Sequence, residues 1–480
     1  MLTLPEQIAA AAGLRDEDRA LVQELSDAWQ THQPGNLLRH RYYTMHNALV
    51  DLGISVPPEL RNLNAACGWA KKCVDVMVEH CKFDGYRTGD EEASALLASI
   101  VRRSKLRATY RKATTSALEQ CFSLYFVSRD EVTGHARVSA YPASVCGVTW
   151  DDANQRLQAA MFVVSTRRVG RFGERQPDWV NVVTDEYLIR VRRDEGDGWS
   201  AEYERHGLAH LPVFLAAYEP TLERPFGTSR ITREVMGYID SAVRANVNEE
   251  IAAAFAVSTQ KYLLGTDGDP FEGTTPWRAY IGNVFNIDKD EDGDVPQFGQ
   301  LPQPSMEPLN VHWRLLCGRM SAATGIHVSQ FGIVHDNPAS GDAIYAENEP
   351  LILKCKDWNG DMQDVLTDIA TACIATERGT TFEAIEEENL GIVANLPNPA
   401  MPTLAQQTDS SVKIASQVEG FTDTKPFWTM NGFSDEEADY IMAQVRLARQ
   451  ETEARQATNA AISAIFGGAA DEGSTEGVPR

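Results

Sequence analysis

The sequence predicts an α+β protein that is mainly helical and elongated, with an antiparallel β-rich section set between helices. Apolar residues recur at helical spacing through residues 1–120. Residues 121–218 instead hold short runs of β-branched and aromatic residues, separated by turn signals such as Thr133-Gly134. A long helical pattern then covers residues 228–257. Helices and strands that are segregated along a chain in this way are typical of the α+β class.

The first 120 residues are predicted to form a series of helices. Pro34 and Gly35 indicate a polar turn after the first helix, and Pro57-Pro58 should end the second, because proline cannot continue a helix. The helices are expected at Leu14–Trp29, Leu37–Leu52, Leu63–Cys81, Asp90–Arg103 and Lys105–Leu118.

The runs within residues 121–218 are predicted to be antiparallel strands, since only short turn segments separate them. Connections this short favour hairpins over crossovers. The strands are expected at Cys121–Ser128, Ala136–Tyr141, Val145–Trp150, Leu157–Thr166, Trp179–Val183, Tyr187–Arg193 and Trp199–His206.

A helix of residues 228–257 is predicted from apolar residues spaced four apart. On a helix with 3.6 residues per turn this spacing makes an inclined ridge that packs against a neighbouring helix. The ridge consists of Ile231, Val235, Ile239, Val243, Val247 and Ile251. Thr228 or Ser229 is expected to cap the first free N–H groups. A core helix of a large domain would show the same spacing, so both interpretations stay open.

Residues 258–308 are acidic and rich in proline, and should project outward rather than line a core. Strands are expected at Lys261–Leu264 and Tyr280–Ile287. The acidic residues Asp288, Asp290, Asp292 and Asp294, with Gly293, match the start of a calcium-binding loop. The twelfth position of such a loop would be Gly299 instead of a bidentate glutamate, so a solvated hairpin tip is favoured and no metal site is predicted.

The rest of the chain is predicted to be helical with two irregular interruptions. A helix returns at residues 309–326, ending near Gly325, and a loop covers residues 327–341. Residues 342–395 begin with a long helix that Pro350 should kink, because proline removes a donor and crowds the carbonyl of Ala346. After a proline-rich linker, residues 396–466 hold helices at Ala405–Glu419 and from Ser434, and residues 467–480 are expected to be disordered.

Composition and motifs argue against most enzymes. The net charge of −24, from 68 acidic and 44 basic residues, argues against a broad DNA-gripping face but not against a wall that DNA slides past. No phosphate-binding loop, zinc-protease motif or nucleophile elbow occurs, and no cofactor is expected. The 8 cysteines lack metal-ligand spacing and should be free thiols. Neither a signal peptide nor a transmembrane helix is expected.

Several stretches, in a fixed order, resemble the portal proteins of tailed bacteriophages, in the branch common among phages of actinobacteria. The N-terminal stretches are Tyr42–His46, Leu52–Leu60, Val74-Asp75 and Phe83–Tyr86. The later ones are the turn at His210–Val213 through Phe226–Ile231, then Ala323–Ile326, Phe331-Gly332, Asn337–Gly341 and Ala343-Ile344. His327 departs from the proline that often follows Gly-Ile in this family, which affects only the start of the following loop.

The resemblance implies an elongated portal subunit in a ring, usually of twelve copies. It assigns residues 1–227 to the wing (helical 1–120, β-rich 121–218), 228–257 and 309–326 to the two stem helices, 258–308 to the clip, 327–341 to the tunnel loop, 342–395 to the kinked helix and wing return, and 396–466 to the crown. The tunnel-loop residues near the DNA channel would be His335, Asp336, Asn337, Pro338, Ala339 and Ser340, and the clip aspartates would dock partners.

The resemblance also implies where such a ring works. It would sit at one capsid vertex of the virion, after assembly in the host cytoplasm, and would have no membrane partner. Double-stranded DNA would pass through it without sequence specificity. Its protein partners would be the large terminase that powers packaging, the head–tail adaptor, and the major capsid and scaffolding proteins.

Alternatives remain open at this point. The chain could be another virion structural protein, such as an adaptor or a capsid-associated protein, or an unrecognised hydrolase built on the β section. Two basic runs, in residues 102–112 and 167–175, could contact nucleic acid or an acidic neighbouring subunit, or could be solvated faces. The overall negative charge favours the last two possibilities over DNA.

Overall fold

The computed structural model describes residues 6–47, 66–169, 174–194, 198–257, 261–264, 297–300, 305–333, 341–400, 404–433 and 435–467. The chain divides into two compact units. One comprises residues 1–339 and 346–399, and the other comprises residues 340–345 and 400–480. Within the described part of the chain, every helix falls short of the length or apolar character that crossing a membrane requires.

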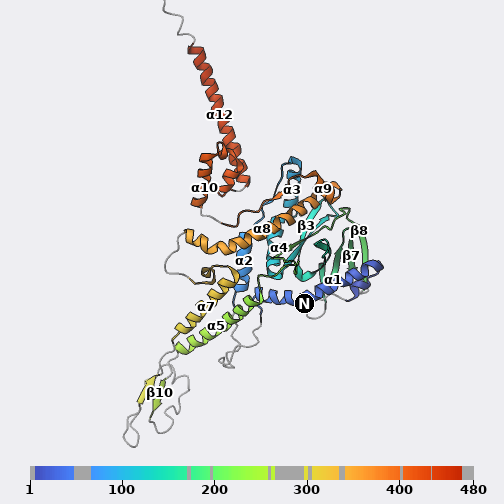
Figure 1. Cartoon of the computed structure of the whole chain (residues 1–480), viewed down its shortest axis with the longest axis vertical. Helices are drawn as coiled ribbons and strands as arrows, with labels where there is room; N and C mark the ends of the chain where they lie inside the picture. Colours follow the sequence, from blue (N-terminus) through green and yellow to red (C-terminus); the bar gives the residue numbers. More distant parts are fainter. Residues whose placement is uncertain are drawn as a thin grey trace, which may run out of the picture. The chain divides into compact units, whose positions relative to one another are not determined.

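The first unit begins with the helices η1 (Glu6–Ala10), α1 (Asp16–Tyr43), α2 (Trp69–His80), α3 (Glu91–Arg103) and α4 (Leu106–Gln120) (Figure 1). The turn expected at Pro34 is wrong, because α1 continues through that residue. An internal proline costs about 3 kcal/mol. The helix tolerates it because it is buried on both sides of the proline, through Leu25 and Trp29 before it and Tyr42 after it.

The β section forms two antiparallel sheets, so the predicted α+β class is confirmed. One sheet has the order β3-β2-β9 and the other the order β4-β5-β6-β7-β8. The strands are β2 (Phe122–Arg129), β3 (Ala136–Pro142), β4 (Cys146–Asp151), β5 (Arg156–Val169), β6 (Glu174–Val183), β7 (Tyr187–Arg193), β8 (Trp199–Arg205) and β9 (Val213–Ala217). Sequence analysis placed only a turn before β9, because Pro212 obscures the start of this short strand, which pairs with β2.

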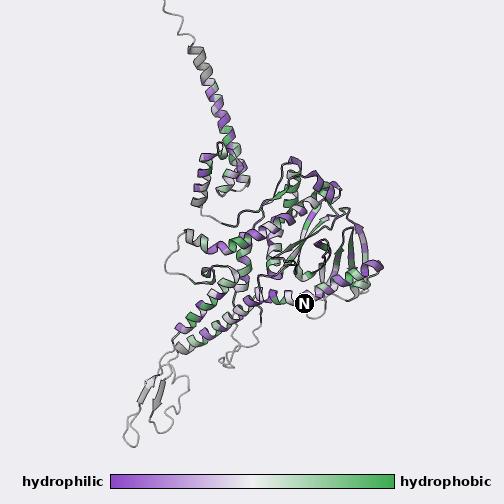
Figure 2. Ribbon diagram, in the orientation of Figure 1, coloured by the Kyte–Doolittle hydropathy of each residue, from purple (hydrophilic) through white to green (hydrophobic). Residues whose placement is uncertain are grey.

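The two sheets and their helices stack in layers. Alternate residues of β5 point to opposite faces, as the period of two requires. Met161 packs with Leu25 and Trp29 of α1, whereas Phe162 packs with Leu124 and Phe126 of the three-stranded sheet. The other face of that sheet packs on α4 in the largest core cluster. In Figure 2 hydrophobic and hydrophilic residues are interspersed along these strands and helices, as expected of elements with one buried face.

Three long helices complete the first unit. They are α5 (Arg233–Val257), α7 (Glu307–Thr324) and α8 (Gly341–Arg378). The segment between α5 and α7 contains the antiparallel strands β10 (Lys261–Leu264) and β11 (Gln297–Gln300). The cap predicted at Thr228 or Ser229 is wrong: the Thr232 hydroxyl accepts from the Val235 N–H at 3.2 Å. Ser229 is buried and donates to the carbonyl of Glu119 instead.

The chain after α8 adds small elements to the first unit and then forms the second. Residues Phe382–Glu388 form the helix α9, and β12 (Val393–Ala394) pairs with β1 (Tyr86–Arg87). The second unit contains α10 (Leu404–Gln417), η5 (Phe421–Asp423), α11 (Lys425–Met430) and α12 (Asp435–Gly467). The chain between the two helices predicted here is therefore partly helical, and Pro426 occupies the first turn of α11, where its missing N–H is harmless. Ser434 and residues 468–480 lie outside the described residues.

Candidate functional site: the α5–α7 helix pair and its base

The helices α5 and α7 lie side by side and extend away from α2 and the sheets (Figure 1). The predicted ridge of α5 is buried: Ile231, Val235, Ile239, Val243 and Val247 are 0–4% exposed. Ile251, nearer the end of α5, is only partly buried. Most of the ridge belongs to a core that also contains Leu316, Cys317 and Met320 of α7. The ridge is therefore used inside the chain, so a surface that could bind a second copy must be sought elsewhere.

The base of α5 is anchored to α1 through a carboxylate. The Tyr42 hydroxyl donates to both carboxylate oxygens of Asp240, at 2.8 and 3.0 Å. Burial, together with this hydrogen bond to an anion, raises the pKa of Tyr42 to about 12. The phenol therefore stays protonated and keeps its donor role at any physiological pH.

Arg230, which sequence analysis did not single out, lies just before α5 and connects it to α2, to Tyr218 directly after β9, and to the end of α7. It is 6% exposed. Its Nε donates to the Cys73 carbonyl of α2 at 2.7 Å, and its Nη1 donates to the Tyr218 hydroxyl at 3.0 Å. Its Nη2 donates to the carbonyl of Thr324, the last residue of α7, at 2.9 Å. Since terminal helix carbonyls lack helical partners and carry partial negative charge, the guanidinium acts as a C-terminal cap for α7.

The turn that follows α7 lies against α8. Gly325 ends α7 with a φ of +70°, as a C-terminal glycine stop predicts. A Cβ on Gly325 would lie 3.6 Å from Cβ of Pro350, so this turn packs on the proline of α8. His327 reaches the same helix, with Nε2 3.2 Å from a carboxylate oxygen of Glu347. These contacts fix where the loop after residue 333 departs.

The structure describes only part of the predicted site. The predicted loop residues His335–Ser340 and the aspartates 288, 290, 292 and 294 lie outside the described residues, and so does the calcium alternative. Pro350 is exposed within α8, which the structure assigns as one helix from Gly341 to Arg378. Within the described ranges, no three His, Cys, Asp or Glu side chains gather as a metal site would require.

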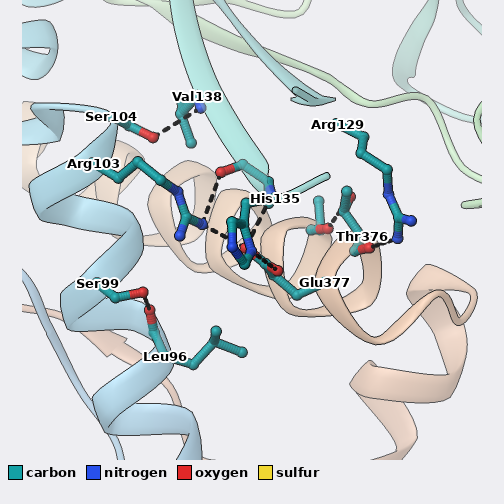
Figure 3. Close-up of polar contacts among 11 residues, drawn as sticks. Leu96, Ser99, Arg103, Ser104, Arg129, His135, Val138, Thr376 and Glu377 are labelled. Atoms are coloured by element: carbon teal, nitrogen blue, oxygen red, sulfur yellow. Dashed lines mark hydrogen bonds and ion pairs between the residues drawn. The ribbon is translucent and has the colours of Figure 1, made fainter. Parts of the chain in front are cut away.

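The first basic run, in residues 102–112, lies on the surface of α3 and α4 and is mostly unpaired. Among its described residues, Arg103 forms an ion pair with Glu377 near the end of α8 (Figure 3), and Arg107 donates to a backbone carbonyl. His135 and the Ala136 N–H also contact that carboxylate, at 3.0 and 2.9 Å. Burial alone would raise the pKa of Glu377, but these hydrogen bonds and the Arg103 charge lower it, so Glu377 stays ionised. Arg103 thus holds α3 against α8.

The second basic run, in residues 167–175, lies where β5 and β6 meet. Arg167 and Arg168 face Gln176 and Arg175 across this hairpin. Residues 170–173 at its tip lie outside the described residues. This run therefore lies at the hairpin end of two inner strands of the five-stranded sheet.

The helix pair is a mechanical arrangement rather than a chemical one. Two long antiparallel helices share a core, and polar contacts hold their base to α1, α2 and α8. Such a frame resists bending and can hold the elements at its two ends at a fixed separation. These features are typical of a structural protein that works in an assembly.

The comparisons with known proteins agree with this class. The chain is 23% identical to the portal protein of Mycobacterium phage D29 over 445 residues, which cover 86% of this chain and 84% of that protein. It is 22% identical over 438 residues to the portal protein of Mycobacterium phage L5, covering 84% of each. The resemblance to portal proteins of actinobacterial phages is confirmed by these matches. The relatives are structural proteins and not enzymes, as we expected for this chain.

Other comparisons add less. No protein-family model matches the chain. Among solved structures, a chain from the virion of a native gene transfer agent particle is similar with a TM-score of 0.45 and 11% identity, over 89% of this chain and 98% of that one. A chain from the neck of the native particle has a TM-score of 0.42 and 10% identity, over 76% and 90% respectively. Likenesses at this level carry no conclusion about assembly.

Proposed function

We propose that this chain is the portal subunit of a phage particle, which forms a ring at one capsid vertex and encloses the channel through which the genome is packaged and ejected. The observation that carries the proposal is the similarity to two portal proteins across more than four-fifths of each chain. The expected ring has twelve subunits. Its place is the virion, after assembly in the host cytoplasm.

In this proposal α5 and α7 are the stem helices around the channel. Their shared core and the Arg230 contacts give the pair the stiffness that a channel wall needs. Residues 258–308 are the clip, and the antiparallel pairing of β10 with β11 supports this by joining the two ends of the segment. The aspartates 288, 290, 292 and 294 would dock the large terminase and later the head–tail adaptor.

The loop at residues 327–341 is the proposed tunnel loop, with His335–Ser340 nearest the DNA. The contacts of Gly325 with Pro350 and of His327 with Glu347 support this, because they anchor the start of the loop at the base of the stem. A kink at Pro350 would let α8 turn beneath the wing. Major capsid and scaffolding proteins would contact the outside of the ring. Double-stranded DNA would pass without sequence-specific contacts, since an acidic chain does not grip phosphates.

The test is the assembly state of the purified full chain. Light scattering across a range of concentration and salt should show a closed oligomer, and negative-stain images should show rings with a central channel. A monomer under all conditions would overturn the proposal. To test the clip, the four aspartates would be changed to asparagine and binding to purified large terminase measured. The control changes Glu383, Glu386, Glu387 and Glu388 of α9 to glutamine. Equal loss in both variants, or no loss in the clip variant, would reject the clip assignment.

A further inference from the structure

A row of aspartates on α8 has no partner within the described chain. Asp357, Asp361, Asp364 and Asp368 are all exposed and recur at intervals of four, three and four, so they share one side of the helix. None of them forms an ion pair or a hydrogen bond with a described residue. We name these four residues the acidic row. Like charges at these spacings destabilise a helix by a few tenths of a kcal/mol per pair.

The acidic row borders a hollow with an apolar floor. This groove has a volume of about 760 Å³, and Asp361, Asp364 and Asp368 line it along α8. Its floor and far wall include Leu211, Val213, Phe214, Met362, Val365 and Leu222. Leu222 is 93% exposed. Asp368 is exposed overall but partly desolvated by the groove wall, and this desolvation, with the repulsion of acidic neighbours, raises its pKa to about 6 even though His210 opposes the shift. The charge of His210 is thus too weak to offset desolvation and repulsion at Asp368.

A complementary surface exists at another place in the same unit. We name Arg102, Lys105, Arg107, Arg111 and Lys112 the basic face. All five are exposed. The Arg107 guanidinium donates to the Asp84 carbonyl at 2.8 Å, while the side chains of the other four form no hydrogen bond or ion pair with a described residue. On α4, Arg107, Arg111 and Lys112 occupy the side opposite to the buried Leu106, Tyr110 and Ala113.

The two surfaces cannot meet within one chain. The basic face adjoins β3, where Lys112 and Arg137 line a common hollow, whereas the groove adjoins β9. β3 and β9 are the two edges of the three-stranded sheet. In addition, α3 contacts α8 through Glu377 (Figure 3). Glu377 follows Asp368 by nine residues, which places it about 180° away around the helix. The acidic row therefore faces away from α3.

We propose that the groove and acidic row of one subunit bind the basic face of the next copy of this chain. A ring needs two different complementary surfaces on each subunit, and the buried α5 ridge leaves this requirement to other surfaces. The apolar floor would exclude water once it is covered, which strengthens the ion pairs at its border. The inference rests on the proposed ring and names the surface through which the ring closes.

The experiment uses two full-length variants and their mixture. Asp361→Lys with Asp364→Lys makes both surfaces positive, and Arg111→Asp with Lys112→Asp makes both negative. Each variant alone should assemble at least about tenfold less readily than the natural chain, because like charges would meet at every interface. An equimolar mixture should restore rings, in which the two variants alternate. Restoration also proves that both variants are folded. The control, Glu24→Lys with Glu92→Lys, changes charge at exposed positions elsewhere and should assemble normally.

Each outcome decides the matter. If either reversed variant assembles like the natural chain, or if two folded variants fail to assemble when mixed, the interface is wrong while the ring proposal stands. Normal rings of a reversed variant with altered DNA retention would also overturn the proposed interface, because they would place the acidic row in the channel. If the natural chain forms no oligomer, the proposed function fails. Should a reversed variant not fold, Asp361→Asn with Asp364→Asn and Arg111→Gln with Lys112→Gln replace the pair. Each should reduce the salt dependence of assembly, and an unchanged dependence would contradict the inference.

Discussion

Replacing Arg230 with methionine should loosen the base of the α5–α7 pair. Methionine fills much of the volume but donates no hydrogen bond. The Thr324 carbonyl would lose its partner at 2.9 Å, and the Tyr218 hydroxyl would lose a donor at 3.0 Å. The Cys73 carbonyl lies within α2, whose own hydrogen bonds still serve it. The loss is therefore concentrated at the end of α7.

The magnitude follows from these contacts. A buried acceptor left without a donor costs about 1–3 kcal/mol, and a cation at a helix C-terminus contributes about 0.3–1 kcal/mol. Removing the buried guanidinium returns part of its desolvation penalty. We expect a net loss of about 3 kcal/mol in the free energy of unfolding of the first unit.

The assay is hydrogen exchange of the full chain at several denaturant concentrations, followed at residues 321–326. Exchange there should accelerate by about 100-fold, because 3 kcal/mol corresponds to two powers of ten. The matched control is Lys354→Met, which removes a pair with Glu219 at 2.9 Å that is 39% and 50% exposed. That control should change stability by less than about 0.5 kcal/mol. Equal effects of the two substitutions, or unchanged exchange at the end of α7, would refute the role given to Arg230.

Three further substitutions test other parts of the account. Gly227→Ala should destabilise the first unit by at least about 2 kcal/mol in thermal unfolding. The reason is that φ of Gly227 is +73° and a Cβ there would lie 2.4 Å from the Tyr218 carbonyl oxygen. A neutral effect would contradict this geometry. Asp368→Asn should stabilise the isolated subunit above pH 6 by about 1 kcal/mol or less. The pKa of Asp368 is about 6 in the folded state and lower in the unfolded state. The natural chain therefore loses stability as pH rises from 4 to 6, and the asparagine variant does not. The difference should vanish below pH 4, and a constant difference would exclude titration as its cause. His327→Ala removes the 3.2 Å contact with Glu347 and should speed hydrogen exchange in residues 328–333. The free energy of unfolding should change by less than about 1 kcal/mol. Unchanged exchange would show that this contact does not hold the loop.

Local patterns predicted the elements well where a single physical preference dominated. The strands Tyr187–Arg193 and Lys261–Leu264 have the predicted bounds, because alternation and flanking turns agree there. The α5 ridge is buried in the chain's own core, while the packing of stem helices between subunits stays a prediction. Pattern analysis failed where tertiary contacts overruled local preference. Burial on both sides carries α1 through Pro34, and pairing with β2 makes a strand directly after Pro212.

The candidate site depended more on spatial information. Arg230 looks like an ordinary charged residue before a helix, and only the structure brings α2, Tyr218 and α7 to its guanidinium. The acidic row could have been found from its spacing of four, three and four along a helix. Its lack of a partner, and its position opposite to Glu377, required the fold. Sequence spacing shows which residues share a face but not what that face meets.

The central claim is that copies of this chain surround a channel with α5 and α7 at its wall. A symmetric cryo-EM reconstruction of the purified natural chain tests it most directly. The account predicts a closed ring in which these two helices of every subunit lie nearest to the axis around an open channel. A ring whose axis lies far from both helices, or particles that contain only single subunits, would contradict it.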